Sequence, residues 1–287
     1  MQPATIAMRR NEGRGKPRPT EATPVLMVNR FLAWTAFVCF MLVAAPVWGA
    51  DDGLPQIASA GRTPYAAVIV WHDVVPAKEV WFDTPLDTFK TQLAAIARGG
   101  YHVVTLEALR AHLERGAPLP SKPLVLTFDD NGHGIYENAF PLLRRYRFPA
   151  TMFVHTNFVG TTTTKRHTTW PQLLEMSRSG VMTIQSLTAN HPPDLRALSD
   201  AAIVHELTLS RTSLQYHLGH KIYALVYPED NYDARLEKLA AANGYELAFI
   251  EDWGNAGDSS NLLEIHRYSA LTRFDQALGD VAAGHAP

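Results

Sequence analysis

The stretch LVLTFDDN, residues 124–131, is an apolar run of strand-forming residues that ends abruptly in two adjacent aspartates. Repulsion between the carboxylates and their loss of hydration both oppose this arrangement, so a cation, a proton or open water must compensate. Consecutive side chains at a strand end point to opposite sides. We therefore expect Asp129 and Asp130 to differ in role, one as a metal ligand and the other as a free base.

Short apolar runs of this kind alternate with amphipathic segments from Tyr65 onward. AAVIVWH (66–72) predicts a strand, and the apolar spacing and Gly-Gly stop of DTPLDTFKTQLAAIARGG (83–100) predict a helix. Further strands are predicted in HVVTL (102–106), LVLTF (124–128), ATMFV (150–154), VMTIQ (181–185), IYALVYP (222–228), ELAFI (246–250) and LLEIHRY (262–268). The amphipathic segments that alternate with them are EALRAHLERG (107–116), YENAFPLLRRY (136–146), PQLLEMSRSG (171–180), residues 199–218 and DARLEKLAAANG (233–244). Seven or eight β/α alternations predict an α/β fold, a distorted (β/α)7–8 barrel in a single domain.

The first fifty residues differ in composition from the rest of the chain. Arg30 precedes an apolar stretch over residues 31–45, and small residues follow near Gly49, which is the layout of a secretory signal. An uncleaved membrane anchor is the alternative, although a spanning helix needs roughly 20 apolar residues. The predicted organisation is a tail and signal peptide at 1–50, a linker at 51–64 and the barrel domain at 65–287.

This layout predicts a periplasmic or secreted protein with no stable membrane span after signal cleavage. The single cysteine, Cys39, lies inside the apolar stretch, so the mature protein would have neither disulfides nor thiol chemistry. The formal net charge of −2, from 26 Lys and Arg against 28 Asp and Glu, is too balanced for a nucleic-acid-binding protein.

Polar side chains directly follow most of the apolar runs. They are His72 and Asp73, Asp129 and Asp130, His155, Tyr227 with Glu229 and Asp230, and Glu251 with Asp252. In a β/α barrel the carboxyl ends of the strands form the active-site face. We expect these groups to converge on one mouth.

These motifs resemble the polysaccharide deacetylase family, the NodB-homology domain of family 4 carbohydrate esterases. The resemblance rests on LVLTFDDN followed by AFPLLRRYRFPATMFVHTNFVG, WPQLLEMSRSGVMTIQSLTANHPPDL, ELTLSRTSLQYHLG and LVYPEDNYD. The upstream VIVWHDV and FKTQLAAIARGGYHVVTLEAL resemble the branch that includes the poly-β-1,6-N-acetylglucosamine deacetylases. The resemblance extends from about Val68 to the C-terminus. It implies a metal-dependent hydrolase that removes N-acetyl groups from an N-acetylglucosamine-type polysaccharide or oligosaccharide.

The resemblance also implies a role for each matching residue. Asp129 would be the general base that deprotonates the attacking water, while Asp130 and His191 would bind a divalent metal: zinc, cobalt or nickel. Such a cation polarises an amide carbonyl and acidifies bound water. His72 would protonate the departing amine, with Asp73 beside it. The YPED segment, with Tyr227 and Glu229, would shape the pocket and supply a backbone N–H to the oxyanion.

Leu187 stands where the family's first metal-binding histidine is expected. A leucine has no lone pair, so we expect a degenerate metal site unless another donor replaces it. The candidate replacements are His133, His155, Gln185 and Asn190. The four histidines His205, His217, His220 and His266 are interpreted as structural.

Two other hypotheses stay open at this level. One is a catalytically silent carbohydrate-binding relative, which Leu187, Asn131 and the altered YPED segment favour. The other is a glycosidase on the same barrel that uses Asp129 with Glu229 or Asp252. That mechanism requires two carboxyl groups about 5 to 9 Å apart across the mouth.

Overall fold

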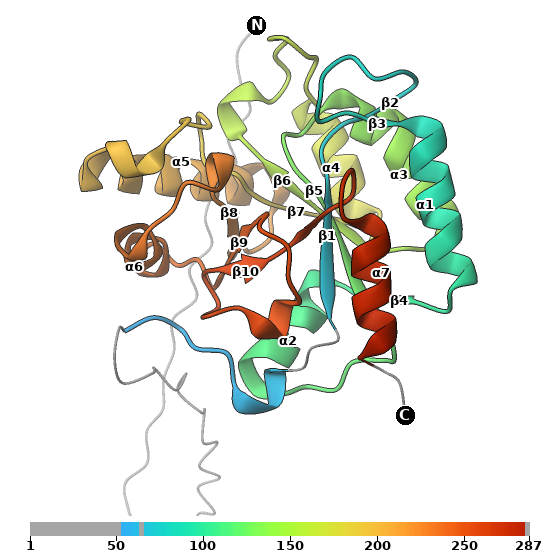
Figure 1. Ribbon diagram of the computed structural model, residues 1–287. Coiled ribbons are helices and arrows are strands. Elements are labelled where there is room, and N and C mark those ends of the chain that lie inside the picture. Colours follow the sequence, from blue (N-terminus) through green and yellow to red (C-terminus); the bar gives the residue numbers. More distant parts are fainter. Residues whose placement is uncertain (1–52, 63–65, 285–287) are drawn as a thin grey trace, which may run out of the picture. The chain divides into compact units, whose positions relative to one another are not determined.

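Strands and helices alternate along residues 53–62 and 66–284, the part of the chain that the computed structural model describes (Figure 1). The strands are β1 Ala67–Trp71, β2 Val74–Val75, β3 Thr84–Pro85, β4 His102–Val103, β5 Pro123–Phe128, β6 Ala150–Val154, β7 Met182–Ser186, β8 Ala224–Val226, β9 Leu247–Ile250, β10 Ile265–His266 and β11 Tyr268–Ser269. The α-helices are α1 Leu86–Arg98, α2 Leu106–Arg115, α3 Phe140–Tyr146, α4 Trp170–Arg178, α5 Asp200–Leu218, α6 Ala234–Ala242 and α7 Phe274–Ala283. Short helical turns are η1 Ser59–Gly61, η2 Ile135–Ala139, η3 Thr156–Phe158, η4 Leu195–Ala197, η5 Pro228–Asp230 and η6 Ala256–Asp258.

The main sheet is parallel and nearly closed into a barrel. Its order is β10-β9-β8-β7-β6-β5-β1-β11, and β4 pairs with the start of β5. The two ends of this order lie on one segment, residues 265–269: β10 pairs with β9, and β11 pairs with β1. The helices surround the sheet, as Figure 1 shows. The predicted α/β barrel in a single domain is confirmed.

Alternation along the strands separates two apolar clusters. In β1, Val68 belongs to an inner cluster that also contains Phe153 and Phe249, whereas Ile69 belongs to an outer cluster with residues of the surrounding helices. In β5, Val125 is inner and Leu126 is outer. Side chains on both faces of these strands are buried, which explains why the strands are continuous apolar runs rather than alternating ones.

The inner cluster is closed at the amino end of the barrel by α2. Leu106, Leu109 and Leu113 of this helix join the inner cluster, and Ile57 joins it from the segment before β1. That segment is fixed by a hydrogen bond from the Ala58 N–H to the Leu113 carbonyl (2.8 Å). In Figure 1, α2 lies below β1. The carboxyl ends of the strands form the opposite end, which we call the mouth.

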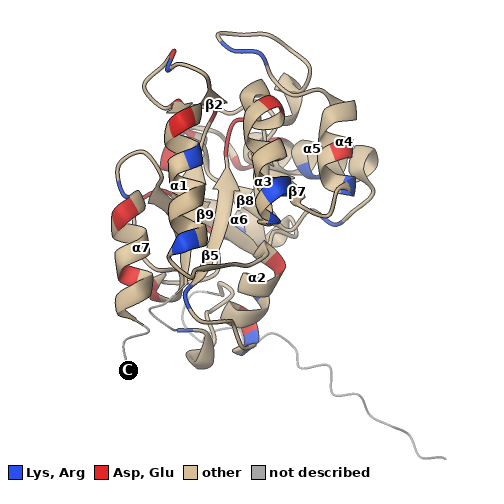
Figure 2. Ribbon diagram, turned by 90° about the vertical axis from the view of Figure 1, so that its right-hand side faces the viewer, with Lys and Arg blue, Asp and Glu red and all other residues tan. Residues whose placement is uncertain are grey.

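Helix α7 has no counterpart among the elements predicted from the sequence. It packs on β1, where Phe274 lies 6.2 Å from the Trp71 ring, and the Tyr101 hydroxyl donates to the Leu278 carbonyl (2.9 Å). In Figure 2, α7 lies beside α1; α1 contains both acidic and basic residues, whereas the charged residues of α7, Asp275 and Asp280, are acidic. The apolar spacing of Phe274, Ala277 and Val281, all buried, was the available signal for this helix.

The predicted tail and signal peptide at 1–50 lie outside the described residues. Within 53–62 and 66–284, no helix combines the length and apolarity that a bilayer crossing requires.

Candidate active site

Asp129 directly follows the carboxyl end of β5 and forms a bidentate ion pair with Arg267. The Nη1 and Nη2 atoms of Arg267 donate to the two carboxylate oxygens at 2.9 and 2.8 Å. The aspartate is 4% exposed and the arginine 1%. Burial alone would lower the pKa of Arg267, but the Asp129 charge and hydrogen bonds raise it overall. Asp129 is therefore held as an oriented carboxylate.

Strand alternation explains why these two residues meet. Asp129 has the same parity as the inner Val125 of β5, and Arg267 has the same parity as the inner Ile265 of β10. Arg267 falls between β10 and β11, where the two edges of the sheet meet. Its guanidinium also lies 5.8 Å from the Phe153 ring centroid and 6.0 Å from that of Phe249.

Asp130 turns away from Asp129 and toward the mouth. Its φ of 68° places it in the left-handed region, and its Oδ1 lies 3.7 Å from Nε2 of His191. Burial raises the pKa of Asp130; the charges of His72 and His191 act against this shift, and those of Asp129 and Glu229 add to it. These interactions bring the predicted base, proton donor and metal ligands to one end of the barrel.

His155 lies beneath this group and stays neutral at pH 7. Its Nε2 is 2.7 Å from the carbonyl oxygen of Asp130, and its ring centroid lies 5.5 Å from that of His191. Burial lowers the pKa of His155 to about 3, and the charges of His191 and His167 add to the lowering. The ring is thus fixed beneath the Asp130 backbone.

Leu187, at the position of the expected metal-binding histidine, is part of the apolar core. Its parity in β7 directs it into the inner apolar cluster, where it is 1% exposed. Across residues 53–62 and 66–284, no group of three His, Cys, Asp or Glu side chains is placed to hold an ion. The donors present, Asp130 and His191, do not fit a three-ligand metal centre.

Each candidate replacement for this ligand has a polar partner, although the Nδ1 atoms of His133 and His155 are buried without one. His133 Nε2 lies 2.7 Å from a carboxylate oxygen of Glu137. Gln185 accepts the backbone N–H groups of Tyr223 and Ala224 at 2.9 Å each. The amide of Asn190 donates to Glu206 on α5, and Glu206 also accepts the backbone N–H groups of Ala189 and Asn190.

Asp73 is buried at the end of β1 and paired with a lysine. It is 4% exposed, and its Oδ2 lies 3.0 Å from Nζ of Lys165. A Cβ atom at Gly132 would lie 2.5 Å from the Asp73 Cγ atom, so this contact requires a glycine. Asp73 therefore holds loops together beside His72, and its predicted contact with substrate stays a prediction.

Tyr227 and Glu229 occupy different environments in the YPED segment. Tyr227 has outer parity in β8, is 1% exposed and stacks on Tyr232 with ring centroids 5.3 Å apart. Burial raises its pKa well above 10. Glu229 is exposed and has a φ of 52°. Of the two, Glu229 is the side chain that a substrate can reach.

Part of the chain is similar to a known protein family. Residues 116–248 match the family described as polysaccharide deacetylase. Residues 116–248 therefore form a polysaccharide deacetylase domain. It is 34% identical over 174 residues to the poly-beta-1,6-N-acetyl-D-glucosamine N-deacetylase of Staphylococcus epidermidis, covering 56% of this chain and 58% of that protein. The chain thus spans less than two thirds of that relative's length.

Two solved structures share the fold of the deacetylase domain. IcaB from Ammonifex degensii aligns with a TM-score of 0.69 at 22% identity, covering 76% of this chain and 97% of that one. The Streptococcus pyogenes deacetylase PplD in complex with acetate aligns with a TM-score of 0.68 at 24% identity, covering 78% and 100%.

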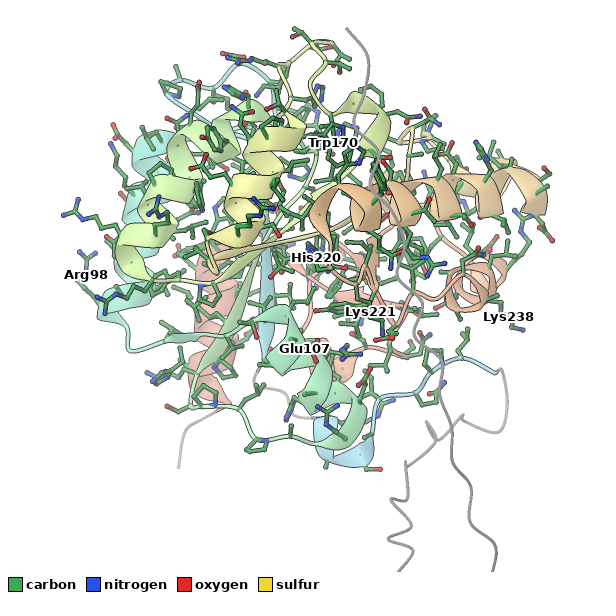
Figure 3. The ribbon with its side chains drawn as sticks, turned by 180° about the vertical axis from the view of Figure 1, so that it is seen from behind. Arg98, Glu107, Trp170, His220, Lys221 and Lys238 are labelled. Atoms are coloured by element: carbon green, nitrogen blue, oxygen red, sulfur yellow. The ribbon has the colours of Figure 1, made fainter. Side chains whose placement is uncertain are left out.

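The histidines interpreted as structural lie outside the mouth of the deacetylase domain or are engaged there. His217 stacks on Trp170 at 3.8 Å, and His220 lies 3.0 Å from the Ile184 carbonyl; Trp170 and His220 are labelled in Figure 3. His205 is exposed on α5. His266 Nδ1 lies 2.5 Å from Asp252, one of the two partners that the glycosidase hypothesis offers for Asp129.

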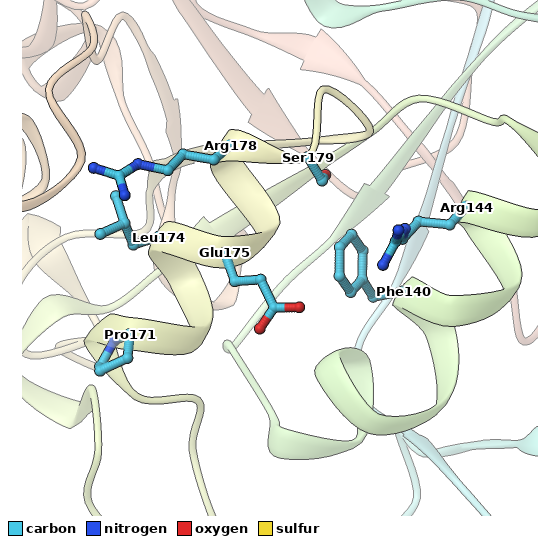
Figure 4. A pocket seen from close by; sticks show the side chains of 7 residues that line it. All are labelled: Phe140, Arg144, Pro171, Leu174, Glu175, Arg178 and Ser179. Carbon is cyan, nitrogen blue, oxygen red and sulfur yellow. The ribbon is translucent and has the colours of Figure 1, made fainter.

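A hollow of about 540 Å³ lies between α3 and α4 of the deacetylase domain (Figure 4). Its lining residues are Phe140, Arg144, Pro171, Leu174, Glu175, Arg178 and Ser179. None of the mouth residues lines this hollow, so it is not the candidate active site.

Sequence reasoning missed Arg267 and Lys165. For Arg267 the available signal was a lone basic residue inside the last apolar run, LLEIHRY. Lys165 stands in a polar loop, TTTTKRHTT, where no local pattern marks it as half of an ion pair.

Proposed function

We propose that this deacetylase domain hydrolyses N-acetyl groups of an N-acetylglucosamine-type polysaccharide or oligosaccharide. In this reaction the amide C–N bond breaks, a C–O bond forms with water, and acetate and a free amine leave. The observation that carries the proposal is the Asp129 carboxylate, fixed by Arg267 beside Asp130 and His191. The name of the Staphylococcus epidermidis relative supports the choice of glycan.

Asp129 is the proposed acceptor of the proton from the attacking water. The two hydrogen bonds from the buried guanidinium fix its orientation, which a general base requires. His72 is the proposed proton donor to the leaving amine. It is half-buried at the end of β1, and its charge acts on Asp130. Glu229 and the backbone of residues 227–230 are proposed to contact the substrate.

We further propose that the metal site is degenerate. Asp130 and His191 would be its remaining donors, and a divalent cation would bind weakly, since losing even an outer-shell partner typically costs about 10- to 100-fold in affinity or activity. Periplasmic or secreted localisation is proposed from the sequence of residues 1–50 alone.

The second candidate is a catalytically silent carbohydrate-binding relative. The observation that favours it is Leu187, packed in the inner cluster at the position of an expected ligand. Leu187→His separates the candidates, because it returns an imidazole to this position, and Leu187→Met is the matched control. For a silent relative that lost only this ligand, calorimetry should show at least tenfold tighter zinc binding in Leu187→His, together with new acetate release.

The first experiment measures acetate release from β-1,6-linked N-acetylglucosamine oligomers, with a chelator or with added zinc or cobalt. We expect release by the unmodified protein and a loss of roughly 100-fold or more in Asp129→Asn, the scale of a lost general base. Because this change leaves Arg267 unpaired, folding is checked by thermal unfolding, and His72→Gln serves as an independent variant. No release by the folded protein under any condition would favour the silent relative.

A further inference from the structure

The loop between β2 and β3 presents an exposed tryptophan beside the mouth. Trp81 is 77% exposed, and of the described residues only Tyr216 and Trp253 are also large, hydrophobic and exposed. In Figure 1 this loop lies near the labels β2 and β3, beyond the carboxyl end of β1. An exposed indole leaves apolar surface in water, and covering that surface with a ligand would contribute roughly 25 cal/mol per Å² buried.

The loop that carries Trp81 is firmly anchored. Asp83 is fully buried, and its Oδ2 accepts the backbone N–H groups of Glu79 (2.9 Å) and Val80 (3.0 Å). Its other oxygen pairs with Lys165, which also pairs with Asp73. Burial alone would lower the pKa of Lys165, but the two carboxylates raise it overall. The loop therefore holds Trp81 in a fixed position.

A chain of ring contacts links Trp81 to the proposed proton donor. The Phe82 ring lies 5.5 Å from the His72 ring, and the Trp81 ring meets the Phe82 ring edge-on, also at 5.5 Å. Trp81 thus stands two ring contacts from the reacting group. A polymer whose acetyl group reaches the mouth would place a neighbouring sugar unit against the indole.

The other two exposed aromatic side chains lack this combination of features. The Arg273 guanidinium lies 3.9 Å above the Trp253 ring and already occupies one of its faces. Tyr216 lies in the last turn of α5, and its ring contacts that of His217, which stacks on Trp170. Of these three side chains, only Trp81 combines an open indole face, an anchored loop and a link through Phe82 to a mouth residue, His72.

We propose that Trp81 is a stacking platform for a glucosamine unit next to the unit being deacetylated. This inference rests on the proposed function and adds a binding subsite to it. The axial C–H bonds of a pyranose ring form an apolar face that packs flat on an aromatic ring, whose face is electron-rich. The neighbouring Lys78 and Glu79 are exposed and can hydrogen-bond to sugar hydroxyl groups.

The test measures affinity by calorimetry for a β-1,6-linked N-acetylglucosamine pentamer and for the N-acetylglucosamine monomer. Trp81→Ala should weaken pentamer binding by roughly three- to tenfold, the scale of one aromatic stacking contact. Monomer binding should not change, because the monomer occupies the mouth alone. Trp81→Phe should retain most of the pentamer affinity, and Tyr216→Ala is the matched control that should match the unmodified protein.

The outcomes separate this inference from the proposed function. Equal pentamer affinity in Trp81→Ala and the unmodified protein would overturn the platform while leaving the function standing, provided acetate is still released. An unmodified protein that neither binds the pentamer nor releases acetate would overturn both. An equal loss for pentamer and monomer would also contradict the platform, because it would place Trp81 at the mouth itself.

Discussion

At the end of β5, two neighbouring carboxylates meet different surroundings. Asp129 continues the inner face of the strand and meets Arg267, while Asp130 adopts a left-handed backbone and faces His191. The sequence predicted this division because side chains alternate along a strand. It did not predict the arginine. The compensating charge for Asp129 is a guanidinium from the far end of the chain.

The residue-scale prediction concerns this ion pair. Arg267→Met should lower the free energy of unfolding by about 3 to 5 kcal/mol, because it leaves a buried carboxylate without a partner. The double variant Arg267→Met with Asp129→Asn should recover much of this loss, since no unpaired charge remains. Urea denaturation of both variants measures the difference. A double variant less stable than Arg267→Met would contradict the explanation.

The loop between β2 and β3 owes its shape to Lys165, at the centre of an ion-pair cluster with Asp73 and Asp83. Burial would raise the pKa of Asp83, but Lys165 and the N–H groups of Val80 and Glu79 lower it overall, below its ordinary value of 3.8. A lowered carboxyl pKa means that the folded state favours the ionised form. This stabilisation is present above about pH 3.8 and is lost as the pH falls through the folded pKa.

Removing the charge of Asp83 tests this pH dependence. Asp83→Asn should cost about 1 to 3 kcal/mol of unfolding free energy at pH 7, as expected for a buried charged hydrogen bond. The difference from the unmodified protein should stay constant from pH 8 to pH 5 and shrink below about pH 3.8. Urea denaturation across this range measures it. Asp87→Asn, which breaks an exposed pair with Lys90, is the matched control and should change little.

For the whole molecule, the decisive feature is that the two edges of the sheet meet on residues 265–269. This segment pairs with β9 through Ile265 and His266, and with β1 through Tyr268 and Ser269. It leads into α7, which packs against β1. Open edges of a parallel sheet expose unpaired backbone groups and favour aggregation.

The prediction at this scale concerns the closing segment. A chain that ends at Glu264 loses β10, β11, α7 and the partner of Asp129 together. We expect it to lose the cooperative thermal transition and to aggregate, as measured by circular dichroism and size-exclusion chromatography beside the chain 53–284. A cooperative transition in the shortened chain would show that closure is not required for folding.

Local patterns determined much of this protein from sequence alone. Apolar runs and helical spacing predicted most strands and helices, and strand ends predicted the groups at the mouth, because both patterns depend on neighbours close in the chain. Two elements differ from the prediction. Strand β4 covers only His102–Val103 of the predicted HVVTL, and helix α7 was not predicted.

Only the tertiary structure decided the pairings between distant residues. Arg267 and Asp129 are 138 positions apart, and Lys165 and Asp83 are 82 apart. These partners meet because the barrel closes and its loops pack together, and no local pattern encodes which charges then face each other. The same holds for Leu187: the sequence showed that a ligand was missing, and the inner apolar cluster explains why the side chain there is apolar.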